Sequence, residues 1–488
     1  DGFVELQTPK IVASATETYP LSTPKPLWAE QDPNDWVEAP VSTIRPVLAK
    51  SGIDPAEVKG IGLSGQMHGA VFLDGNGHVL RPSILWCDQR TQAECDWIMD
   101  TVGREKVVEL TLNPVLTGFT AGKIVWVRNN EPEVYAKTKK VLLPKDFIRY
   151  KLTGEFATEV SDASGTSLFN VTKRQWADEM LDGAGIPRDW MPKAYESPEV
   201  SGKISEDVSC LTGLKAGTPV VGGGGDQAAG AVGNGIVETG IVSSTVGTSG
   251  VVFAFADQPV LDPGLRVHTF CHAVPGKWHV MGVMLSAGGT LRWYRDTFAR
   301  QEMAEAAAAG TEVYDTISKQ VESAEPGCEG LICLPYLTGE RTPYPDPNAR
   351  GVFFGITLRH DKPHFARSVY EGVTYGLRDS FEIFQAMKVP INQVRASGGG
   401  ARSPIWRQIQ ADVTGYEHVL INIDEGPALG VALLAGVGTG VYPSVEEACR
   451  SVIKVASSTQ PDMARKAIYD RYYGVYRALY PALKDQFK

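Results

Sequence analysis

A run of β-branched residues, a cluster of glycines and a helical pattern follow one another twice in this chain, and this arrangement limits the folds open to it. Val220-Val221 leads into Gly222–Gly225, and Val394–Ser397 leads into Gly398–Gly400. Glycine makes up 51 of the 488 residues, above the usual ~7%. Glycine lets a backbone approach a ligand closely, and open α/β sheets bind ligands at the carboxyl ends of strands. The pattern therefore predicts an α/β fold with two related domains, joined near Glu238 and closing on a cleft.

Further short strands are expected around both clusters. In the first half, Val58–Ser64 is typical of a strand, Ala70–Leu73 of its antiparallel return, and Val141–Leu143 of another strand. In the second half, Ile241–Val246 and Val251–Phe255 are expected to form a hairpin.

The composition excludes several classes of partner. Acidic residues outnumber basic ones by 57 to 47, and the resulting net charge of −10 argues against nucleic acid or anionic membrane as a partner. The longest stretch of low polarity, Val220–Val237, contains Asp226, Gln227 and Asn234, which is unlike a membrane span. Residues 1–20 lack the pattern of a signal peptide. We therefore expect a soluble, cytoplasmic protein with no nucleic-acid and no membrane partner.

The cysteines and histidines favour a structural role over a metal site. Seven cysteines are widely spaced and form no C-x-x-C pair, which is typical of a protein from a reducing compartment. The nearest approach to a zinc site is His268, Cys271, His272 and His279. No second Cys/His pair lies at ligand spacing nearby, so a buried strand is the favoured interpretation.

Familiar nucleotide motifs do not fit this sequence. Gly118–Ile124 resembles a P-loop, but three residues separate its glycines instead of four, and Ile124 stands where Ser or Thr would bind magnesium. No G-x-G-x-x-G follows a predicted strand, so a Rossmann dinucleotide site is poorly supported. A phosphate would need another device to hold it.

Two glycine-containing turns are candidates for that device. The predicted hairpin tip within Ser244–Gly250 can point N–H and hydroxyl groups at an anion, although a plain β-turn is the alternative. The turn Gly398–Gly400, followed by Ala401 and Arg402, is the stronger candidate. Its backbone without side chains admits a flat ring or a phosphate, and the helix that follows presents free N–H groups.

Asp226 is the single residue that most clearly suggests catalysis. It follows four glycines at the carboxyl end of an apolar strand, where a carboxylate can accept a proton from a substrate hydroxyl. The alternative is a cap for the helix that begins there, a common role of aspartate. The glycines that clear space around this one carboxylate favour the catalytic interpretation.

The loop Gly65–Gly69 and its surroundings are a candidate site for a polyhydroxylated ligand. Gln66, Met67 and His68 are flanked by glycines, and amide and imidazole groups suit recognition of hydroxyls, although a lone histidine is more often structural. One strand later, Trp86 offers an aromatic wall. Asp88 and Arg90 beside it are either further ligand-binding groups or a surface ion pair next to a packed tryptophan.

Longer motifs show a resemblance to a known family. These motifs are Gly118–Trp126, Gly351–Glu371, the loop Ser64–Gly69, and the segments Pro26–Pro33 and Leu334–Pro343. With them the chain resembles the FGGY carbohydrate kinases, and within that family the members that act on xylulose. The similarity runs from about the eleventh residue to the last helix.

The resemblance implies a fold, a reaction and a set of site residues. The fold would be two ribonuclease-H-like (actin-like ATPase) domains with the site in the cleft between them, residues 1–237 for the sugar and 238–488 for the nucleotide. The reaction would be ATP-dependent phosphorylation of D-xylulose to D-xylulose 5-phosphate, with Mg²⁺ as cofactor. Asp226 would be the catalytic base with Gln227 beside it, and Met67 and His68 the sugar-binding pair. The nucleotide-binding residues would be Gly247, Thr248, Ser249, Trp293, Gly399, Gly400 and Ser403. The magnesium ligands stay unknown, and a homodimer stays open.

The start of the sequence departs from the family pattern. The family opens with a strand and a phosphate hairpin of the form Asp-x-Gly-Thr-Ser/Thr, ending in a lysine a few residues on. Here Asp1-Gly2 leads directly to Phe3–Leu6 and then to Ile11–Thr18. Because the opening strand belongs in the middle of the first sheet, and its loss would leave a neighbour unpaired, we expect that the sequence omits residues that the molecule possesses.

Three alternative functions follow from the same residues. The first is a kinase for another sugar or polyol, such as ribulose, gluconate or glycerol, against which the Gln66-Met67-His68 loop argues. The second is a non-catalytic protein that responds to a sugar or nucleotide, supported only by the departure at the start of the sequence. The third, an NAD-dependent dehydrogenase, lacks its sequence fingerprint.

Overall fold

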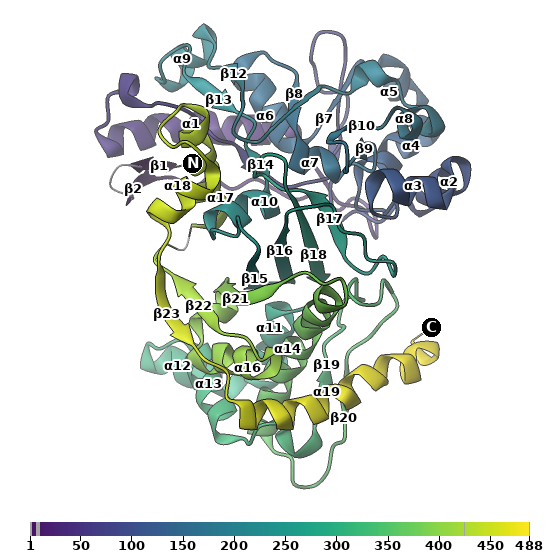
Figure 1. Cartoon of the computed structure of the whole chain (residues 1–488), viewed down its shortest axis with the longest axis vertical. Coiled ribbons are helices and arrows are strands. Elements are labelled where there is room, and N and C mark those ends of the chain that lie inside the picture. The colour runs from purple at the N-terminus through teal and green to yellow at the C-terminus, as the bar shows by residue number, and fades with distance from the viewer. Residues whose placement is uncertain (1, 6–9, 424, 488) are drawn as a thin grey trace.

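The second half of the chain is built on one continuous sheet. The computed structural model describes residues 2–5, 10–423 and 425–487 (Figure 1). Seven strands lie in the order β17-β18-β16-β15-β21-β22-β23. They are β15 (Gly240–Val246), β16 (Gly250–Ala256), β17 (His268–Cys271), β18 (Trp278–Met284), β21 (Ile391–Ser397), β22 (His418–Ile421) and β23 (Val455–Thr459). The predicted hairpin is confirmed, because β15 and β16 pair antiparallel. On the other side β15 pairs parallel with β21, so the carboxyl ends of both strands meet at one edge.

The first half contains shorter strand pairs. The strand expected over residues 58–64 is reduced to β4 (Ser64–Gly65) and a single bridge from Ile61 to Val220, and β4 lies parallel to β14 (Gly224–Gly225). The expected antiparallel return is wrong. The strand β5 (Val71–Leu73) pairs with β7 (Lys140–Leu142), which corresponds to the predicted strand at 141–143. All three residues of β5 are buried, so this strand belongs in the interior.

The beginning of the described chain forms a strand pair. The strand β1 (Gly2–Glu5) pairs antiparallel with β2 (Lys10–Ser14), which overlaps the first part of the segment expected over residues 11–18. Asp1 and Leu6, which belong to the expected start of the sequence, lie outside the described residues.

Both predicted glycine turns join a strand to a helix. The strands β13 (Pro219–Val221) and β14 lead to α10 (Asp226–Gly233), and β21 leads to α15 (Gly399–Arg402) and α16 (Pro404–Thr414). Gly223 has a φ of +69°, and a Cβ there would lie 2.0 Å from the carbonyl oxygen of Leu63. Gly398 has a φ of +78°, and a Cβ there would lie 2.6 Å from the carbonyl oxygen of Val246. Only glycine fits either position without strain.

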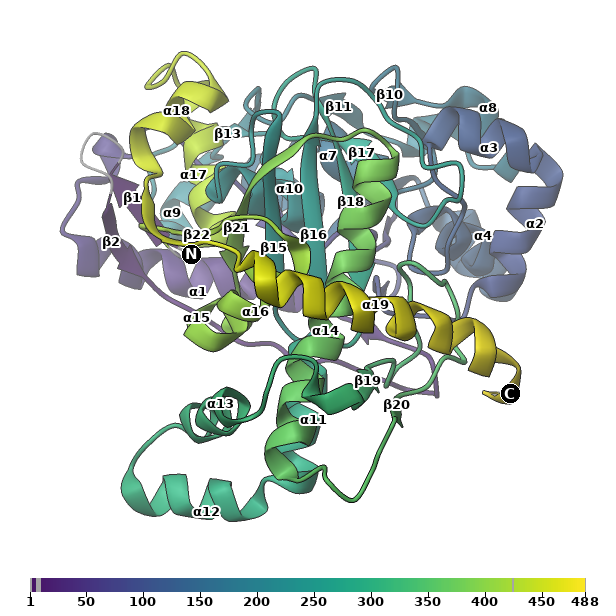
Figure 2. The same cartoon turned by 60° about the horizontal axis from the view of Figure 1, so that its bottom comes forward.

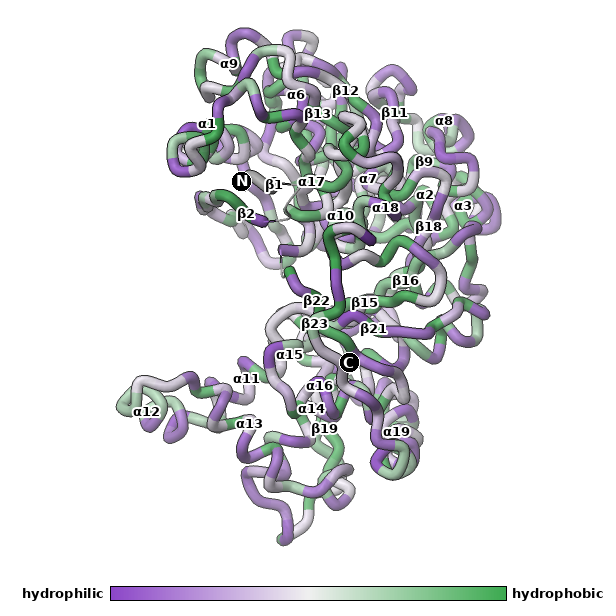
Figure 3. Tube along the Cα trace, turned by 60° about the vertical axis from the view of Figure 1, so that its left-hand side comes forward, coloured by the Kyte–Doolittle hydropathy of each residue, from purple (hydrophilic) through white to green (hydrophobic). Residues whose placement is uncertain are grey.

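The helices α10 and α17 (Gly426–Gly438) touch through their backbones. A Cβ on Gly430 would lie 1.8 Å from the carbonyl oxygen of Ala229, and one on Gly233 would lie 1.8 Å from that of Gly426. Through this contact, α17 in the last part of the chain packs against α10 in the first half. Figure 1 shows α17 and α18 (Val445–Val452) beside α10. Seen from the side, the trace divides into two lobes that meet at the seven-stranded sheet (Figure 3). The division at residues 237 and 238 stays a prediction.

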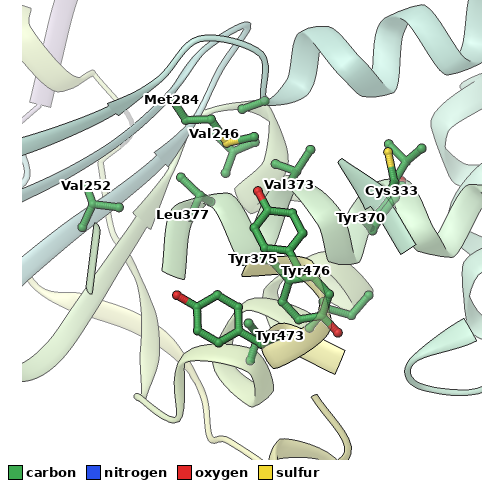
Figure 4. Packing of buried hydrophobic residues seen from close by; sticks show 14 of the residues in the cluster. Val246, Val252, Met284, Cys333, Tyr370, Val373, Tyr375, Leu377, Tyr473 and Tyr476 are labelled. Carbon is green, nitrogen blue, oxygen red and sulfur yellow. The ribbon is translucent and has the colours of Figure 1, made fainter. Parts of the chain in front are cut away.

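A large aromatic core supports the sheet from one face. The helix α14 (Lys362–Ala386) packs behind the strands, and the long helix α19 (Met463–Leu483) crosses it (Figure 2). Tyr375 and Tyr476 lie between these helices, near Met284 and Leu377 (Figure 4). The hydroxyl of Tyr476 donates to that of Tyr336 at 3.3 Å. A core packed in this way keeps the strand ends in place. None of the described helices is both long and apolar enough to cross a membrane.

We expect Gly430→Ala to destabilise the protein. The new methyl group would overlap the carbonyl of Ala229, so the two helices must move apart, at a cost of about 1–3 kcal/mol for such overpacking. The measurement is the midpoint of thermal unfolding by calorimetry. Gly474→Ala is the matched control, because Gly474 lies exposed in α19 with open space around its Cβ position. That variant should gain about 0.5–1 kcal/mol from helix propensity. Equal midpoints for the two variants would contradict the backbone contact.

Candidate active site

The Asp226 carboxylate stands at the first residue of α10. Its Oδ1 accepts from the backbone N–H of Gln227 at 2.9 Å, and its Oδ2 accepts from Gln227 Nε2 at 3.2 Å. The residue that caps the helix is Gly225, so capping does not account for this aspartate. Burial raises the pKa of Asp226 above its ordinary value, and the bonds from Gln227 oppose that change. A carboxylate with a raised pKa at the N-terminus of a helix is suited to accept a proton.

Buried polar groups hold the backbone directly before Asp226. The N–H of Gly225 lies 3.2 Å from Glu159 Oε1 and 3.2 Å from Ser161 Oγ, both fully enclosed near α7 (Val160–Ser164). Lys145 balances the charge, with its Nζ 3.7 Å from Glu159 and 3.5 Å from Asp162. Burial raises the pKa of Asp162 well above its usual range, and the charge on Asp226 adds to this. Sequence reasoning missed this network because its members lie in three separate segments, around residues 145, 159–162 and 225.

Met67 connects the loop Gly65–Gly69, the predicted sugar-binding loop (the sugar loop), to the segment that holds Asp226. Its side chain is 4% exposed and lies against two glycines. A Cβ on Gly225 would lie 2.8 Å from Met67 Cγ, and one on Gly165 would lie 3.1 Å from Met67 Cε. The predicted sugar loop and the predicted base are therefore neighbours in the fold.

His68 is a neutral imidazole in this structure. Burial, together with the nearby charge of Lys123, holds the pKa of His68 well below its usual value. Its Nδ1 lies 2.7 Å from the carbonyl oxygen of Gly165. A carbonyl oxygen only accepts, so Nδ1 carries the proton and Nε2 keeps its lone pair. The ring stacks on Phe119 with centroids 4.5 Å apart. Nε2 is thus free to accept a hydrogen bond from a ligand hydroxyl.

The other predicted sugar-site residues differ in their surroundings. Gln66 donates from Nε2 to Gln31 Oε1 at 2.9 Å, which ties the loop to another of the family motifs. Trp86 leaves 45% of its surface exposed, so its ring is available to a ligand. Asp88 and Arg90 form an ion pair 2.7 Å long that is buried, not on the surface. Both are occupied by structural contacts and are unsuited to contact a sugar.

The hairpin tip and the second glycine turn meet at one edge of the large sheet. The carbonyl of Thr248 accepts from the N–H groups of Ala287 and Gly289, both at 3.0 Å, so the tip lies on the start of α11 (Gly288–Phe298). A Cβ on Gly400 would lie 2.6 Å from the side chain of Val246, the last residue before the tip. The predicted residues Gly247, Thr248, Ser249, Gly399 and Gly400 therefore lie together.

Trp293 and Ser403 also border this edge. Trp293 lies on α11 with 36% of its surface exposed, and its ring stands edge-on to Phe298 with centroids 5.5 Å apart. The Ser403 hydroxyl caps α16 through the N–H of Trp406 at 3.4 Å and lies 3.2 Å from the Ser318 hydroxyl. Capping accounts for this serine, and a contact with a nucleotide stays a prediction.

Arg341 is a cation near the sugar loop that sequence reasoning did not assign. The loop that holds it is fastened to the end of β18, because Glu340 Oε1 accepts from the N–H of Leu285 at 2.9 Å. Among the described residues, no hydrogen bond or ion pair engages its guanidinium. Its charge contributes to lowering the pKa values of His68 and His268, so it lies within electrostatic reach of both. The motif Leu334–Pro343 contributes to the family resemblance, but nothing in its sequence indicates this placement.

Comparison with known proteins identifies the family. A model described as the N-terminal domain of the FGGY family of carbohydrate kinases matches residues 3–233, and that for the C-terminal domain matches residues 242–439. The chain belongs to the FGGY family of carbohydrate kinases. The expected fold with two actin-like domains and the prediction of a carbohydrate kinase are thereby confirmed.

Individual relatives are similar over nearly the whole chain. The xylulose kinase of Escherichia coli (strain K12) is 41% identical over 475 residues, which is 97% of this chain and 95% of that protein. The gluconokinase of Bacillus subtilis (strain 168) is 32% identical, with 89% of this chain and 85% of that protein covered. The crystal structure of xylulose kinase from Rhodospirillum rubrum has a TM-score of 0.91 at 30% identity, covering 99% of this chain and 96% of that chain.

We expect Glu340→Gln to change how stability depends on pH. Burial raises the pKa of Glu340 to about 8, above the ~4.3 of an unfolded chain. Between these values the folded state holds a proton that the unfolded state releases, so the wild type loses stability as pH rises. The slope is at most about 1.4 kcal/mol per pH unit. Glutamine can accept the same bond from Leu285 and does not titrate.

The measurement is the free energy of unfolding by urea at pH 5, 6, 7 and 8. The variant should gain stability relative to the wild type as pH rises. Glu305→Gln, on the exposed face of α12 (Arg300–Ala309), is the control and should follow the wild type. A constant difference between Glu340→Gln and the wild type over this range would contradict the raised pKa.

Proposed function

We propose that this protein transfers the terminal phosphoryl group of ATP to D-xylulose and forms D-xylulose 5-phosphate. One observation above all supports this proposal: Met67 of the sugar loop lies directly against Gly225, beside the Asp226 carboxylate. A sugar held by that loop would present its hydroxyl to a base. The 41% identity to a xylulose kinase over nearly the whole chain supports the choice of sugar.

Asp226 would act as the general base. The oxygen of the sugar hydroxyl forms a bond to the terminal phosphorus of ATP, the bond from that phosphorus to the bridging oxygen breaks, and ADP leaves. The hydroxyl proton passes to Asp226, whose raised pKa suits this transfer. Phosphoryl transfer depends mainly on positioning and on neutralising charge. One well-placed base is therefore the only reacting group that the protein needs to supply.

His68, Gln66 and Trp86 would bind the sugar from the first half of the chain. The unprotonated Nε2 of His68 would accept from a sugar hydroxyl, and the exposed Trp86 ring would offer an apolar wall. From the second half, Arg341 would donate to the oxygens of the same sugar. A neutral Glu340, expected at pH 7 from a pKa of about 8, leaves that guanidinium available.

The nucleotide would lie at the edge where the hairpin tip meets the second glycine turn. Gly247, Thr248 and Ser249 would hold the phosphates, Gly399, Gly400 and Ser403 the adenosine, and Trp293 would cover one side of the adenine. Mg²⁺ commonly takes one or two carboxylates together with nucleotide phosphates. Asp226 is needed as the proton acceptor, so the protein ligands of the ion stay unassigned. The ion would neutralise charge on the phosphates. A reaction that uses ATP also supports a cytoplasmic location.

A gluconate kinase is the second candidate. The observation that favours it is the 32% identity to a gluconokinase over 89% of this chain. The Arg341 guanidinium, which has no partner among the described residues, is also suited to bind a sugar carboxylate. Direct comparison of sugars separates the two candidates.

The experiment is the release of ADP from MgATP by the purified protein, with D-xylulose, D-ribulose, gluconate and glycerol in parallel. We expect D-xylulose to give the highest kcat/KM, and little ADP without a sugar. Asp226→Asn should lower kcat by about 10²–10⁴-fold while D-xylulose binding, followed by calorimetry, is largely kept, because only the proton acceptor is lost. Gluconate as the best substrate would replace the proposal, and near-normal kcat in Asp226→Asn would remove the base.

We expect Arg341→Gln to weaken the binding of D-xylulose. Loss of a charged hydrogen bond should raise KM for the sugar by about 10–100-fold, with KM for ATP unchanged. Arg350→Gln is the matched control, because Arg350 lies exposed on the same loop and donates only to backbone carbonyls. An Arg341→Gln enzyme with the sugar KM of the Arg350→Gln enzyme would show that Arg341 does not reach the substrate.

A further inference from the structure

The motif Gly118–Trp126 has no part in the proposed chemistry, yet one of its residues is a fully buried cation. Lys123 lies in α4 (Thr120–Asn130) with none of its surface exposed. Its Nζ donates to the carbonyl oxygen of His68 at 2.8 Å and to that of Gly118 at 2.7 Å. Among the described residues no carboxylate forms an ion pair with it. Its ammonium group therefore binds one backbone carbonyl of the sugar loop and one of its own segment.

A buried lysine of this kind is costly to keep. Burial lowers the pKa of Lys123 to about 7, although the charge of Asp88 favours the protonated form. Apolar side chains of similar size often replace buried charges at no loss of stability. Packing alone therefore does not account for a lysine at this position, whereas its two carbonyl partners do.

The carbonyl that Lys123 holds belongs to a strained residue. His68 has a φ of +70°, a conformation that costs a residue with a Cβ about 1–2 kcal/mol. The hydroxyl of Thr120 donates to the same carbonyl at 3.1 Å. Two donors from one turn of α4 thus fix the backbone of His68 in a conformation that it would otherwise leave.

The same segment also fixes the ring of His68. Phe119 lies under the imidazole, with centroids 4.5 Å apart and planes 25° from parallel. A Cβ on Gly165 would lie 2.5 Å from the Cε1 and Nδ1 atoms of the ring, so the glycine makes room for that edge. Phe119, Thr120 and Lys123 are consecutive or one turn apart, and all three contact His68.

We propose that Lys123 is a positioning residue for sugar binding, which acts by holding the His68 backbone so that Nε2 of the imidazole points at the substrate. The inference rests on the proposed function. Lys123 itself does not touch the sugar, because it is enclosed on every side. The resemblance of Gly118–Ile124 to a P-loop is thus misleading, since this lysine binds backbone carbonyls in place of phosphates.

The test is Lys123→Met, which keeps the length of the side chain and removes the ammonium group. We expect KM for D-xylulose to rise about three- to tenfold, the effect of losing the neutral hydrogen bond between His68 Nε2 and the sugar. KM for ATP and the release of ADP without sugar should not change. Lys151→Met is the matched control, because Lys151 donates to the carbonyl of Gly77, away from the site. It should leave both KM values unchanged.

A double-mutant cycle separates positioning from a general structural effect. In a His68→Asn background, where asparagine tolerates the positive φ, Lys123→Met should change KM for D-xylulose less than twofold. The same full effect in both backgrounds, or an unchanged KM in Lys123→Met alone, would overturn the inference. If Lys123→Met does not fold, Thr120→Val, which removes the other donor to His68, takes its place in the same cycle.

Failure of the proposed function has a different signature. A wild-type protein that neither binds nor phosphorylates D-xylulose would overturn the choice of sugar. The double-mutant cycle is then repeated by measuring KM for the sugar that the protein does phosphorylate. If the wild type phosphorylates no sugar, the coupling between substitutions is measured from the midpoint of thermal unfolding instead of from KM. There, Lys123→Met and Thr120→Val, which each remove a donor to the backbone carbonyl of His68, should together lower the midpoint by more than the sum of their separate effects, because the carbonyl then loses both donors. Simple additivity of the two substitutions would overturn the contact between Lys123 and His68 itself.

Discussion

The backbone contact between α10 and α17 is the constraint on which the site depends. Gly430 lies so close to the carbonyl of Ala229 that no side chain fits between the helices. Asp226 is the first residue of α10, so this contact determines where the carboxylate stands. It also brings a segment more than 190 residues away in the chain against the first half. Phosphoryl transfer is sensitive to small displacements, and helices in direct contact give little freedom for them.

Buried charge is arranged differently on the two sides of the site. Behind Asp226, Glu159 and Lys145 hold the backbone of Gly225 through a closed network. Around His68, Lys123 is paired only with carbonyls, and the guanidinium of Arg341 has no partner among the described residues. The first arrangement stabilises a geometry, whereas the second leaves charge available to a ligand. Neutral histidine and cationic arginine together suit a substrate rich in hydroxyl groups.

Much of this could be predicted from the sequence, because the signals were local. The glycine turns before Asp226 and after β21, and the hairpin of β15 and β16, follow from residue types that permit few backbone conformations. The pairing of β5 could not be predicted correctly. A short buried strand has no alternating pattern that identifies its neighbour, and its partner β7 is some seventy residues further along the chain. The same limit applied to Glu159, whose partner Gly225 is distant in sequence, and to Arg341, whose neighbours His68 and His268 are distant in sequence.

The sequence by itself determined the α/β class, the family and the candidate base, since each rests on a short motif whose chemistry is contained in adjacent residues. Only the tertiary structure decided that Asp88 and Arg90 are buried with each other, that Met67 lies against Gly225, and that Lys123 holds His68. Burial and hydrogen bonding between distant segments depend on how the chain packs. Along the sequence alone, Asp88 and Arg90 were equally compatible with a surface ion pair, and nothing in the Gly118–Ile124 segment indicated what its lysine binds.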